Sequence, residues 1–457
     1  MSILGAMRTI RKLAHLSNKQ LLIPYYWIPY QLFASGRAWP PLAVSLELTY
    51  LCNLRCRMCS LVRGSAVTRR AQQSIPELRE ADGTLRPELS TAEYLALIRQ
   101  MSTLGVRSVT MTGGEPLLRS DIVQLSAAVK QAGLGLSIIS NGTVWRPGVI
   151  GALVELGVDS ISVSIDGTRS VHDRIRGVPG SFDRSMSAVT ELIAERKRQQ
   201  RRQPVLAVTC TISAMNQDDL VNLHDLLQGL EIDLLSFGYV HFSSEQLQRS
   251  TDELLGDGGR HLKTALLDPE VLAVNRSTLA SQVRLLRERA SRNRLPVRFV
   301  PDLTADEMSS YFSGHPYTYA TRCFFPWFST RVNPWGDVYP CWLDVRMGNV
   351  REAPLAELWN GAAYRRFRNQ VRRWGLLPKC STCCVLNDKL WSRLPGPLLL
   401  GRRLDRREAR TGAPQPGHPE RSERSALEEQ GSDRSRTGAV RRRKESIALE
   451  DFRRRAT

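Results

Sequence analysis

The sequence predicts an α/β protein whose central part consists of parallel β/α units. From about residue 90 onward, short β-branched runs alternate with longer segments that carry apolar residues at helical spacing. Repeated strand–helix–strand segments of this kind build parallel sheets. About six strand-like runs are present, fewer than the eight strands of a complete β/α barrel.

The elements follow one another in a regular order. Ser90 and Glu93 form a capping-box pattern that begins the first helix of the repeats, and Gly105 ends it. Gly133 ends the next helix in the same way. The expected strands are 43–48, 106–111, 136–139, 158–165, 205–212 and 232–237. The expected helices lie between 90 and 105, between 125 and 133, and near 147–156, 181–200 and 217–229.

Composition favours a cytoplasmic enzyme. A chain of 457 residues can bury a large core, and we expect two domains plus tails. The nine cysteines gather mostly in short-spaced groups, which is typical of metal ligands in a reducing compartment. No run approaches the ~18 apolar residues of a membrane span, and the N-terminus lacks the features of a signal peptide.

Three cysteines just after the first strand carry the strongest chemical signal. Cys52, Cys56 and Cys59 have C-x3-C-x2-C spacing. A zinc site would need a fourth ligand, and no His or Cys lies close by. Three thiolates suit a four-iron four-sulfur cluster whose fourth iron remains open to another ligand.

Polar residues also follow three of the expected strands. Gly113, Gly114 and Glu115 come after the second strand, Ser140 and Asn141 after the third, and Ser164 at the end of the fourth. Because the carboxyl ends of parallel strands meet at one edge, where β/α barrels place their active sites, we expect these residues to lie together.

These motifs resemble the radical S-adenosylmethionine (SAM) superfamily, whose fold is an open six-stranded β/α barrel; here it would cover 42–242. The resemblance implies that Cys52, Cys56 and Cys59 hold a cluster that binds SAM. It also implies that Gly113, Gly114 and Glu115 hold the SAM amino group and that Met58 lies against the adenine. Ser164 and Arg176 would bind the SAM carboxylate and ribose, near Ser140 and Asn141, although Arg174 competes with Arg176.

A second cysteine group resembles the twitch domain, the short form of the SPASM domain found in many radical SAM enzymes. Cys323 and Cys341 flank a probable hairpin, VNPWGDVYP, with seventeen residues between them, and Cys380 and Cys383 follow. The resemblance implies one auxiliary four-iron cluster on these four cysteines. Cys384 could replace Cys383, and zinc is the alternative metal. Asp337 and Asp344 are candidate bases, while Trp342 stands where sulfatase-maturing relatives carry an Asp base.

The expected activity is reductive cleavage of SAM to a 5′-deoxyadenosyl radical, which takes a hydrogen atom from the substrate. Flavodoxin or ferredoxin would supply the electron. We expect dehydrogenation of a small carbohydrate-like molecule, because residues 1–42 are too short for a leader-binding domain. Cross-linking or oxidation of a ribosomally made peptide is the alternative; a non-catalytic electron carrier is the third hypothesis.

The remaining segments flank these domains. Residues 1–41 form a basic amphipathic extension, with an apolar run broken by Pro24 and Pro29, that could contact a membrane surface or a partner through residues 1–40. Residues 243–314 are expected to be a helical connector, 315–390 the auxiliary domain, and 391–457 a disordered Arg-rich tail. No nucleic-acid binding is expected, because aromatic residues do not interleave with the charges.

Truncation after about residue 400 is expected to leave both clusters and SAM cleavage intact. Residues 401–457 carry sixteen Lys or Arg and ten Asp or Glu, a net charge of +6, and Phe452 is their only aromatic residue. Such a segment buries too little apolar surface to fold alone. Iron content and 5′-deoxyadenosine formation of the truncated protein check this. Loss of either would show that the tail belongs to the catalytic domain.

Overall fold

The computed structural model describes residues 22–63, 68, 72, 78–80, 82–256, 269–292, 295–313, 322–383 and 386. The chain divides into two compact units, Met1–Leu394 and Pro395–Thr457, and all described residues belong to the first. Residues 1–21, Cys384 and the Arg-rich tail from 387 onward lie outside the described residues. No helix among the described residues is long and apolar enough to cross a membrane.

Ten strands form one sheet in the order β10-β9-β8-β1-β2-β3-β4-β5-β6-β7. The strands are β1 (Ala43–Thr49), β2 (Ser108–Gly113), β3 (Gly135–Ser140), β4 (Ser160–Ser164), β5 (Val205–Ile212), β6 (Leu234–Tyr239), β7 (Val297–Val300), β8 (Ser329–Val332), β9 (Asp337–Tyr339) and β10 (Gly348–Asn349). Neighbouring strands from β1 to β6 are parallel and adjacent in chain order. The predicted α/β class and six-stranded barrel are therefore confirmed.

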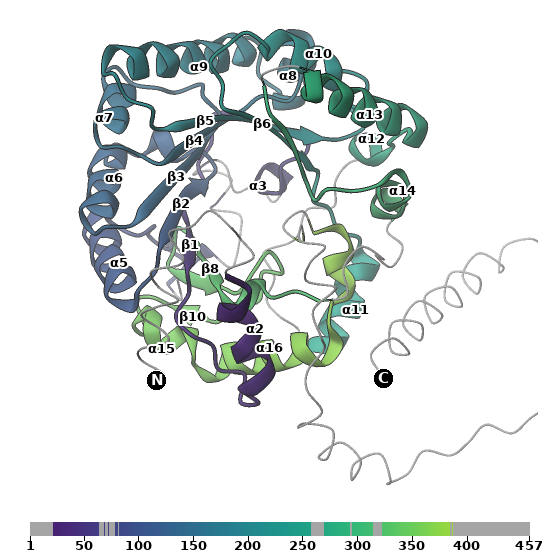
Figure 1. Cartoon of the computed structure of the whole chain (residues 1–457). Coiled ribbons are helices and arrows are strands. Elements are labelled where there is room, and N and C mark those ends of the chain that lie inside the picture. The colour runs from purple at the N-terminus through teal and green to yellow at the C-terminus, as the bar shows by residue number, and fades with distance from the viewer. Residues whose placement is uncertain are drawn as a thin grey trace, which may run out of the picture. The chain divides into compact units, whose positions relative to one another are not determined.

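Helices cover the outside of the parallel strands in an arc, as Figure 1 shows for α5, α6, α7 and α9. The α-helices are α2 (Ile23–Leu32), α3 (Ser60–Arg63), α5 (Thr91–Leu104), α6 (Ile122–Gln131), α7 (Val149–Glu155), α8 (Arg169–Arg176), α9 (Ser181–Arg198), α10 (Leu220–Leu227), α11 (Glu245–Leu255), α12 (Pro269–Leu272), α13 (Arg276–Arg292), α14 (Ala305–Ser313), α15 (Leu355–Trp359) and α16 (Ala362–Trp374). The capping box at Ser90 and Glu93 and the left-handed Gly105 bound α5 as predicted.

The two faces of the sheet differ in chemistry. Side chains that alternate toward the helices, such as Ile138 and Ile161, are fully buried. The opposite face carries small hydroxyl residues: Ser160 donates to Ser137 at 2.8 Å, and Ser162 and Thr209 lie 2.5 Å apart. Ile139 interrupts this face and is 40% exposed. The inner face therefore offers several hydrogen-bonding groups and, at Ile139, an accessible apolar side chain.

Two features of the sheet depart from the sequence interpretation. Residues 243–314 are not only a helical connector, since Val297–Val300 forms β7 and pairs in parallel with β6. The predicted hairpin does form, from β8 and β9. However, β8 also pairs in parallel with β1, so the hairpin extends the barrel sheet. Strand pairing thus makes the cysteine-rich C-terminal region continuous with the barrel.

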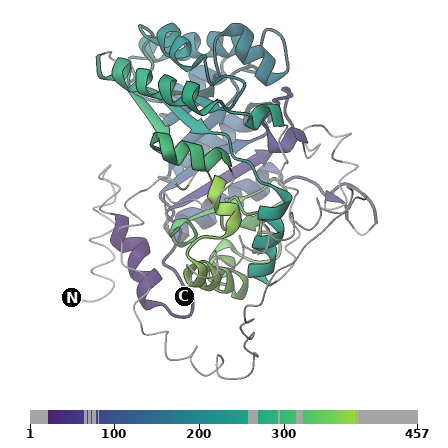
Figure 2. The same ribbon diagram turned by 90° about the vertical axis from the view of Figure 1, so that its right-hand side faces the viewer.

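The N-terminal segment packs on this C-terminal region. Pro24 lies in the first turn of α2 and Pro29 lies inside the helix, so neither proline breaks it. Pro in the first turn costs little, because its missing N–H would have no helical partner there. The rings of Tyr26 and Tyr30 contact Phe324 at centroid distances of 5.3 and 4.8 Å. Figure 2 shows α2 (purple) at the periphery of the ribbon.

Candidate functional site

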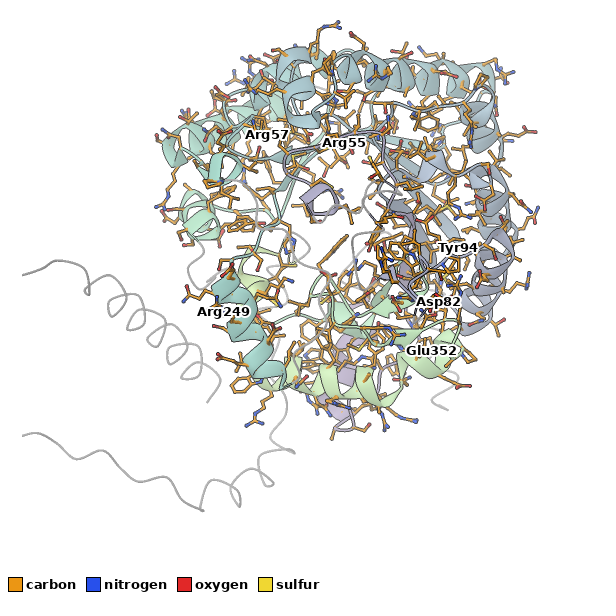
Figure 3. All side chains as sticks on the ribbon, turned by 180° about the vertical axis from the view of Figure 1, so that it is seen from behind. Arg55, Arg57, Asp82, Tyr94, Arg249 and Glu352 are labelled. Carbon is orange, nitrogen blue, oxygen red and sulfur yellow. The ribbon has the colours of Figure 1, made fainter. Side chains whose placement is uncertain are left out.

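The first cysteine group lies in the loop that leaves the carboxyl end of β1. The backbone N–H groups of Arg55 and Arg57 donate to the carbonyls of Arg176 and Ile175 at 3.0 and 2.9 Å. These two bonds hold the loop against the end of α8; Figure 3 labels Arg55 and Arg57. Gly177 permits the approach, because a Cβ there would lie 2.6 Å from the Arg55 carbonyl oxygen.

The thiols of this loop lie within electrostatic reach of one another. Burial raises the pKa of Cys56 to about 12, and the neighbouring Cys59 and Cys52 add to the rise. Burial likewise raises the pKa of Cys52. Nη1 of Arg176 donates to Cys56 Sγ at 3.7 Å, and Nδ2 of Asn141 donates to Cys52 Sγ at 3.8 Å. Grouped thiols with N–H donors on their sulfur atoms fit the ligands of an iron–sulfur cluster.

Glu115 is fully buried beside this loop. Its Oε1 accepts from the Ser140 hydroxyl at 2.9 Å and from Leu117 N–H at 3.0 Å, and its Oε2 accepts from Asn141 N–H at 2.7 Å. A carboxylate has about four acceptor positions, so one remains on Oε2. Burial outweighs these hydrogen bonds and raises the pKa of Glu115 to about 7. The site therefore favours a cationic group beside this carboxylate.

Gly113 and Gly114 approach the cluster loop by their backbone. A Cβ on Gly113 would lie 2.3 Å from the Thr49 carbonyl oxygen, and one on Gly114 would lie 2.3 Å from that of Leu51. Gly114 N–H donates to Thr49 O at 2.7 Å, and Glu115 N–H donates to Leu51 O at 2.9 Å. The glycine pair thus lets the end of β2 pack directly on the loop that carries Cys52.

The other predicted SAM-binding residues differ in how they contact this loop. Arg176 is buried and pairs through Nε with Asp166 at 2.6 Å, in addition to its bond with Cys56. Asp166 and Cys56 keep the pKa of Arg176 above its ordinary value despite burial. Ser164 is half-buried at the end of β4 opposite Thr209, and Met58 is half-buried in the cluster loop. Arg174 donates to the Met215 carbonyl instead.

The second cysteine group is assembled from three separate segments. Cys323 precedes the 3₁₀ helix η4 (Phe325–Trp327), Cys341 follows β9, and Cys380 and Cys383 belong to the end of η5 (Pro378–Thr382). Burial raises the pKa of Cys323 well above its ordinary value, and the nearby Cys380, Cys341 and Cys383 raise it further. The four predicted ligands are therefore brought together in space.

A zinc ion and a four-iron cluster would require different arrangements of these thiols. Within the described part of the chain, no group of three His, Cys, Asp or Glu side chains converges closely enough to hold one metal ion. The sulfur ligands of a zinc ion each lie ~2.3 Å from the same centre. In a four-iron cluster each thiolate binds a different iron, so its ligands stand further apart.

The two candidate bases have different surroundings. Asp337 is buried and binds Arg86 at 3.2 Å, Arg346 at 2.7 Å and Asn349 at 2.9 Å. Burial alone would raise the pKa of Asp337, but hydrogen bonds from Arg346, Asn349 and Arg86 lower it, so the carboxylate is held in its ionised form. Asp344 is half-buried, pairs with Arg331 and has a left-handed backbone, φ 57°.

A buried charged group that the sequence analysis missed joins the two cysteine regions. Arg331 on β8 donates to Glu47 on β1 at 2.8 Å and lies over the rings of Tyr339 and Trp342 at 4.7 and 4.9 Å. The Tyr50 hydroxyl donates to Glu47 at 2.7 Å, and the Tyr94 hydroxyl, labelled in Figure 3, donates to the Glu47 carbonyl. The sequence signal for this pair was Glu47, a carboxylate within the otherwise uncharged strand β1.

Two family models match the chain in this arrangement. Residues 46–227 match the radical SAM superfamily, and residues 323–384 match the SPASM iron–sulfur cluster-binding domain. The chain is a radical SAM protein with a SPASM domain. Its cofactors are thus a four-iron four-sulfur cluster that binds SAM and an auxiliary iron–sulfur cluster that is bound by the SPASM domain. The thiol groups described above fit both.

Curated relatives are similar over most of their lengths. The AdoMet-dependent heme synthase of Methanosarcina barkeri is 26% identical over 353 residues, which span 75% of this chain and 88% of the relative. The PqqA peptide cyclase of Xanthomonas axonopodis is 26% identical over 362 residues, spanning 77% and 82%. In both cases the similarity spans about three quarters of this chain.

Solved structures agree on the fold. Streptococcus suis SuiB bound to S-adenosylmethionine has a TM-score of 0.54 at 14% identity, covering 80% of this chain and 78% of SuiB. SuiB bound to its precursor peptide SuiA has a TM-score of 0.50 at 16% identity, covering 74% and 69%. At 14–16% identity, this likeness is evidence for a shared fold alone.

Proposed function

We propose that this radical SAM enzyme oxidises or cross-links a ribosomally made peptide. The observation that carries the proposal is the SPASM cysteine group joined to the barrel sheet. The chain is also similar to a PqqA peptide cyclase over most of its length, and its fold is like that of SuiB, whose structure holds a precursor peptide. This substrate class replaces the small carbohydrate-like molecule favoured by the sequence. The hydroxyl-lined inner face and exposed Ile139 suit a peptide backbone with an apolar side chain.

When bound, SAM and the iron–sulfur clusters supply the radical that removes a hydrogen atom and the acceptor for the remaining electron. The chain supplies positioning. Cys52, Cys56 and Cys59 would hold the SAM-binding cluster, and Cys323, Cys341, Cys380 and Cys383 the auxiliary one. Ser140 and Asn141 orient the Glu115 carboxylate and tie it to the cluster loop.

Asp344 is the better placed of the two candidate bases. It is held by Arg331 close to the carbonyl of Cys341, which also accepts from Arg331 at 3.4 Å. Its left-handed backbone, unusual for a residue other than glycine, is typical of functional positions. We therefore assign proton removal from the substrate to Asp344 and a structural role to Asp337.

Glu115→Gln is expected to weaken SAM binding about 10- to 150-fold. The variant removes the negative charge beside the free acceptor position on Oε2, where we place the SAM ammonium group. A charge-assisted hydrogen bond contributes roughly 1.5–3 kcal/mol. Equilibrium binding of SAM to the iron-loaded protein measures the loss, and unchanged iron content serves as the control. Wild-type affinity would mean that Glu115 only supports the turn.

SAM affinity of the wild-type protein should also depend on pH. The pKa of Glu115 is raised to about 7 by burial, so its carboxylate is ionised above that pH and neutral below it. The ammonium group requires the ionised form, and affinity should fall as the pH is lowered from 8 to 6. Glu115→Gln should show a flat profile over this range. If SAM affinity changed with pH equally in the wild type and in Glu115→Gln, a titratable group other than Glu115 would be responsible.

Co-expression tests the substrate class. The enzyme is produced together with each short peptide encoded beside its gene, and the mass of each peptide is measured by mass spectrometry. One cross-link removes two hydrogen atoms from the peptide, so its mass should fall by that amount only with active enzyme. Cys56→Ala provides the matched inactive control. The carbohydrate hypothesis would be supported instead if the peptide masses were unchanged and a small sugar-like molecule stimulated 5′-deoxyadenosine formation.

A further inference from the structure

Arg298 is the only charged residue on strands β3 to β7. The sequences of these strands are GLSIIS, SISVS, VLAVTCTI, LLSFGY and VRFV, so together they carry one cation and no carboxylate. Charged side chains are almost always either solvated or paired with an opposite charge. The direction and the partners of this guanidinium therefore decide what Arg298 can bind.

The alternation of β7 directs Arg298 to the inner face of the sheet. The next residue, Phe299, is buried and stacks on Phe237 at a centroid distance of 5.4 Å. Arg287 of α13 lies over the Phe299 ring at 5.3 Å, and α13 belongs to the helices outside the strands (Figure 1). Phe299 thus faces outward. Because successive side chains of a strand point to opposite faces, Arg298 faces inward.

The Arg298 guanidinium reaches over the neighbouring strand. Arg298 and Ser236 are partners in the register of β7 and β6, and Nη2 of Arg298 donates to Ser236 Oγ at 3.4 Å. This distance is longer than the usual ~2.7–3.2 Å. Arg298 is exposed, and within the described parts of the chain it forms no ion pair. A guanidinium has five N–H donors, so most of them can bind an incoming acceptor.

A row of hydroxyl groups continues from Arg298 across the inner face. Thr209 on β5 is the register partner of Ser236, and its Oγ1 lies 2.5 Å from Oγ of Ser162 on β4. Ser162 is in turn the register partner of the exposed Ile139 on β3. The row therefore begins at an accessible apolar side chain, passes through hydroxyl groups and ends at a single cation.

We propose that Arg298, with the Ser236 hydroxyl beside it, binds a carboxylate of the substrate peptide. The inference rests on the proposed function for the nature of the substrate. A planar guanidinium matches a carboxylate through two parallel N–H···O bonds. The Ser236 hydroxyl accepts from Arg298, so its own hydrogen is available to the same carboxylate. An acidic side chain and the C-terminus of a peptide present this same group.

Two other roles of Arg298 give different results in the test. An inward charge on an edge strand can simply prevent pairing with another sheet, and β7 is the last strand of this one. The SAM carboxylate is another possible partner. However, we place SAM beside Glu115 at the end of β2, and strands β3 to β6 lie between β2 and β7 in the sheet.

Fluorescence anisotropy of dansyl-labelled peptides tests the contact. Three probes share the sequence Gly-Leu-X-Leu-Gly: one has glutamate at X and a C-terminal amide, one has glutamine and a free C-terminus, and one has glutamine and the amide. Iron-loaded wild type with SAM should bind a carboxylate probe about 10- to 150-fold more tightly than the uncharged one, the effect of a charge-assisted hydrogen bond. The tighter of the two carboxylate probes identifies the source of the carboxylate. Equal affinities for all three would overturn the proposal.

Variants of Arg298 show whether this residue causes the preference. Arg298→Met should reduce the affinity for the carboxylate probes to that for the uncharged probe, and Arg298→Lys should retain part of it. Arg284→Met on α13, which alters another exposed arginine, should behave like the wild type. Iron content and SAM affinity should not change in any variant. Weaker SAM binding by Arg298→Met would assign the residue to SAM, and aggregation with unchanged probe binding would assign it to edge protection; either result overturns the proposal.

Co-expression separates this inference from the proposed function. The fraction of a co-expressed peptide that loses two hydrogen atoms should be lower with Arg298→Met than with the wild type. If no peptide is modified although probe binding depends on Arg298, the proposed function is wrong and the carboxylate site remains. If the wild type and Arg298→Met modify peptides equally, the carboxylate site is wrong and the proposed function remains.

Discussion

Replacing Cys52, Cys56 and Cys59 together with alanine is expected to halve the iron content and abolish 5′-deoxyadenosine formation. Two four-iron clusters give about eight iron atoms per chain, and the variant should retain about four. The auxiliary thiols lie on other segments, before η4, after β9 and at η5, so their iron should be retained. Iron analysis after anaerobic reconstitution, with product analysis in the presence of dithionite and SAM, measures both effects.

The reciprocal variant completes the test. Replacing Cys323, Cys341 and Cys380 with alanine should also leave about four irons, yet this protein should still form 5′-deoxyadenosine and lose only substrate turnover. Cys210→Ala is the control, because that thiol is fully buried on β5, where it accepts from Asn216 at 3.5 Å. Tightly bound zinc in place of the second four irons would refute the auxiliary cluster. Full iron in the first variant would refute the assignment of the loop.

Arg331→Met should lower the free energy of unfolding by about 3–5 kcal/mol, the cost of breaking a buried ion pair. The Arg331 and Glu47 side chains are only 7% and 6% exposed, and Arg331 also pairs with Asp344. Removing the guanidinium leaves the Glu47 carboxylate buried without a cation. The shift in the urea midpoint of the protein measures the loss, provided that the slope of the transition is unchanged.

Two comparisons show whether the burial of the pair causes the effect. Arg331→Met combined with Glu47→Gln should recover part of the stability, because the amide can still accept from Tyr50 without carrying a charge. Arg284→Met, which removes an exposed pair with Glu288, should cost less than about 1 kcal/mol. If Arg331→Met lowered the free energy of unfolding as little as Arg284→Met does, the buried Arg331–Glu47 pair would not stabilise the contact between β1 and β8.

The local sequence determined the elements whose signals lie within a few residues. The capping box at Ser90 and Glu93, the alternating strands and the cysteine spacing after β1 depend on backbone geometry and short-range chemistry, and each could be predicted. The edge of the barrel could be predicted too, because parallel strands bring their carboxyl ends together. The strand order thus predicts that Glu115, Ser140 and Asn141 lie near Cys52, and their hydrogen bonds confirm it.

Only the tertiary structure decided which distant segments pair and which charges they bury. Four-residue strands such as β7 and β8 carry too little periodicity to be recognised, and their pairing with β6 and β1 depends on the whole sheet. Arg331 meets Glu47 across 284 positions of sequence. Asp337 and Asp344 look equivalent as sequence, but the first carboxylate is bound by four polar side chains, those of Arg86, Arg346, Asn333 and Asn349. A charged side chain acquires its role from its burial and its partners, and both are set by contacts between distant parts of the chain.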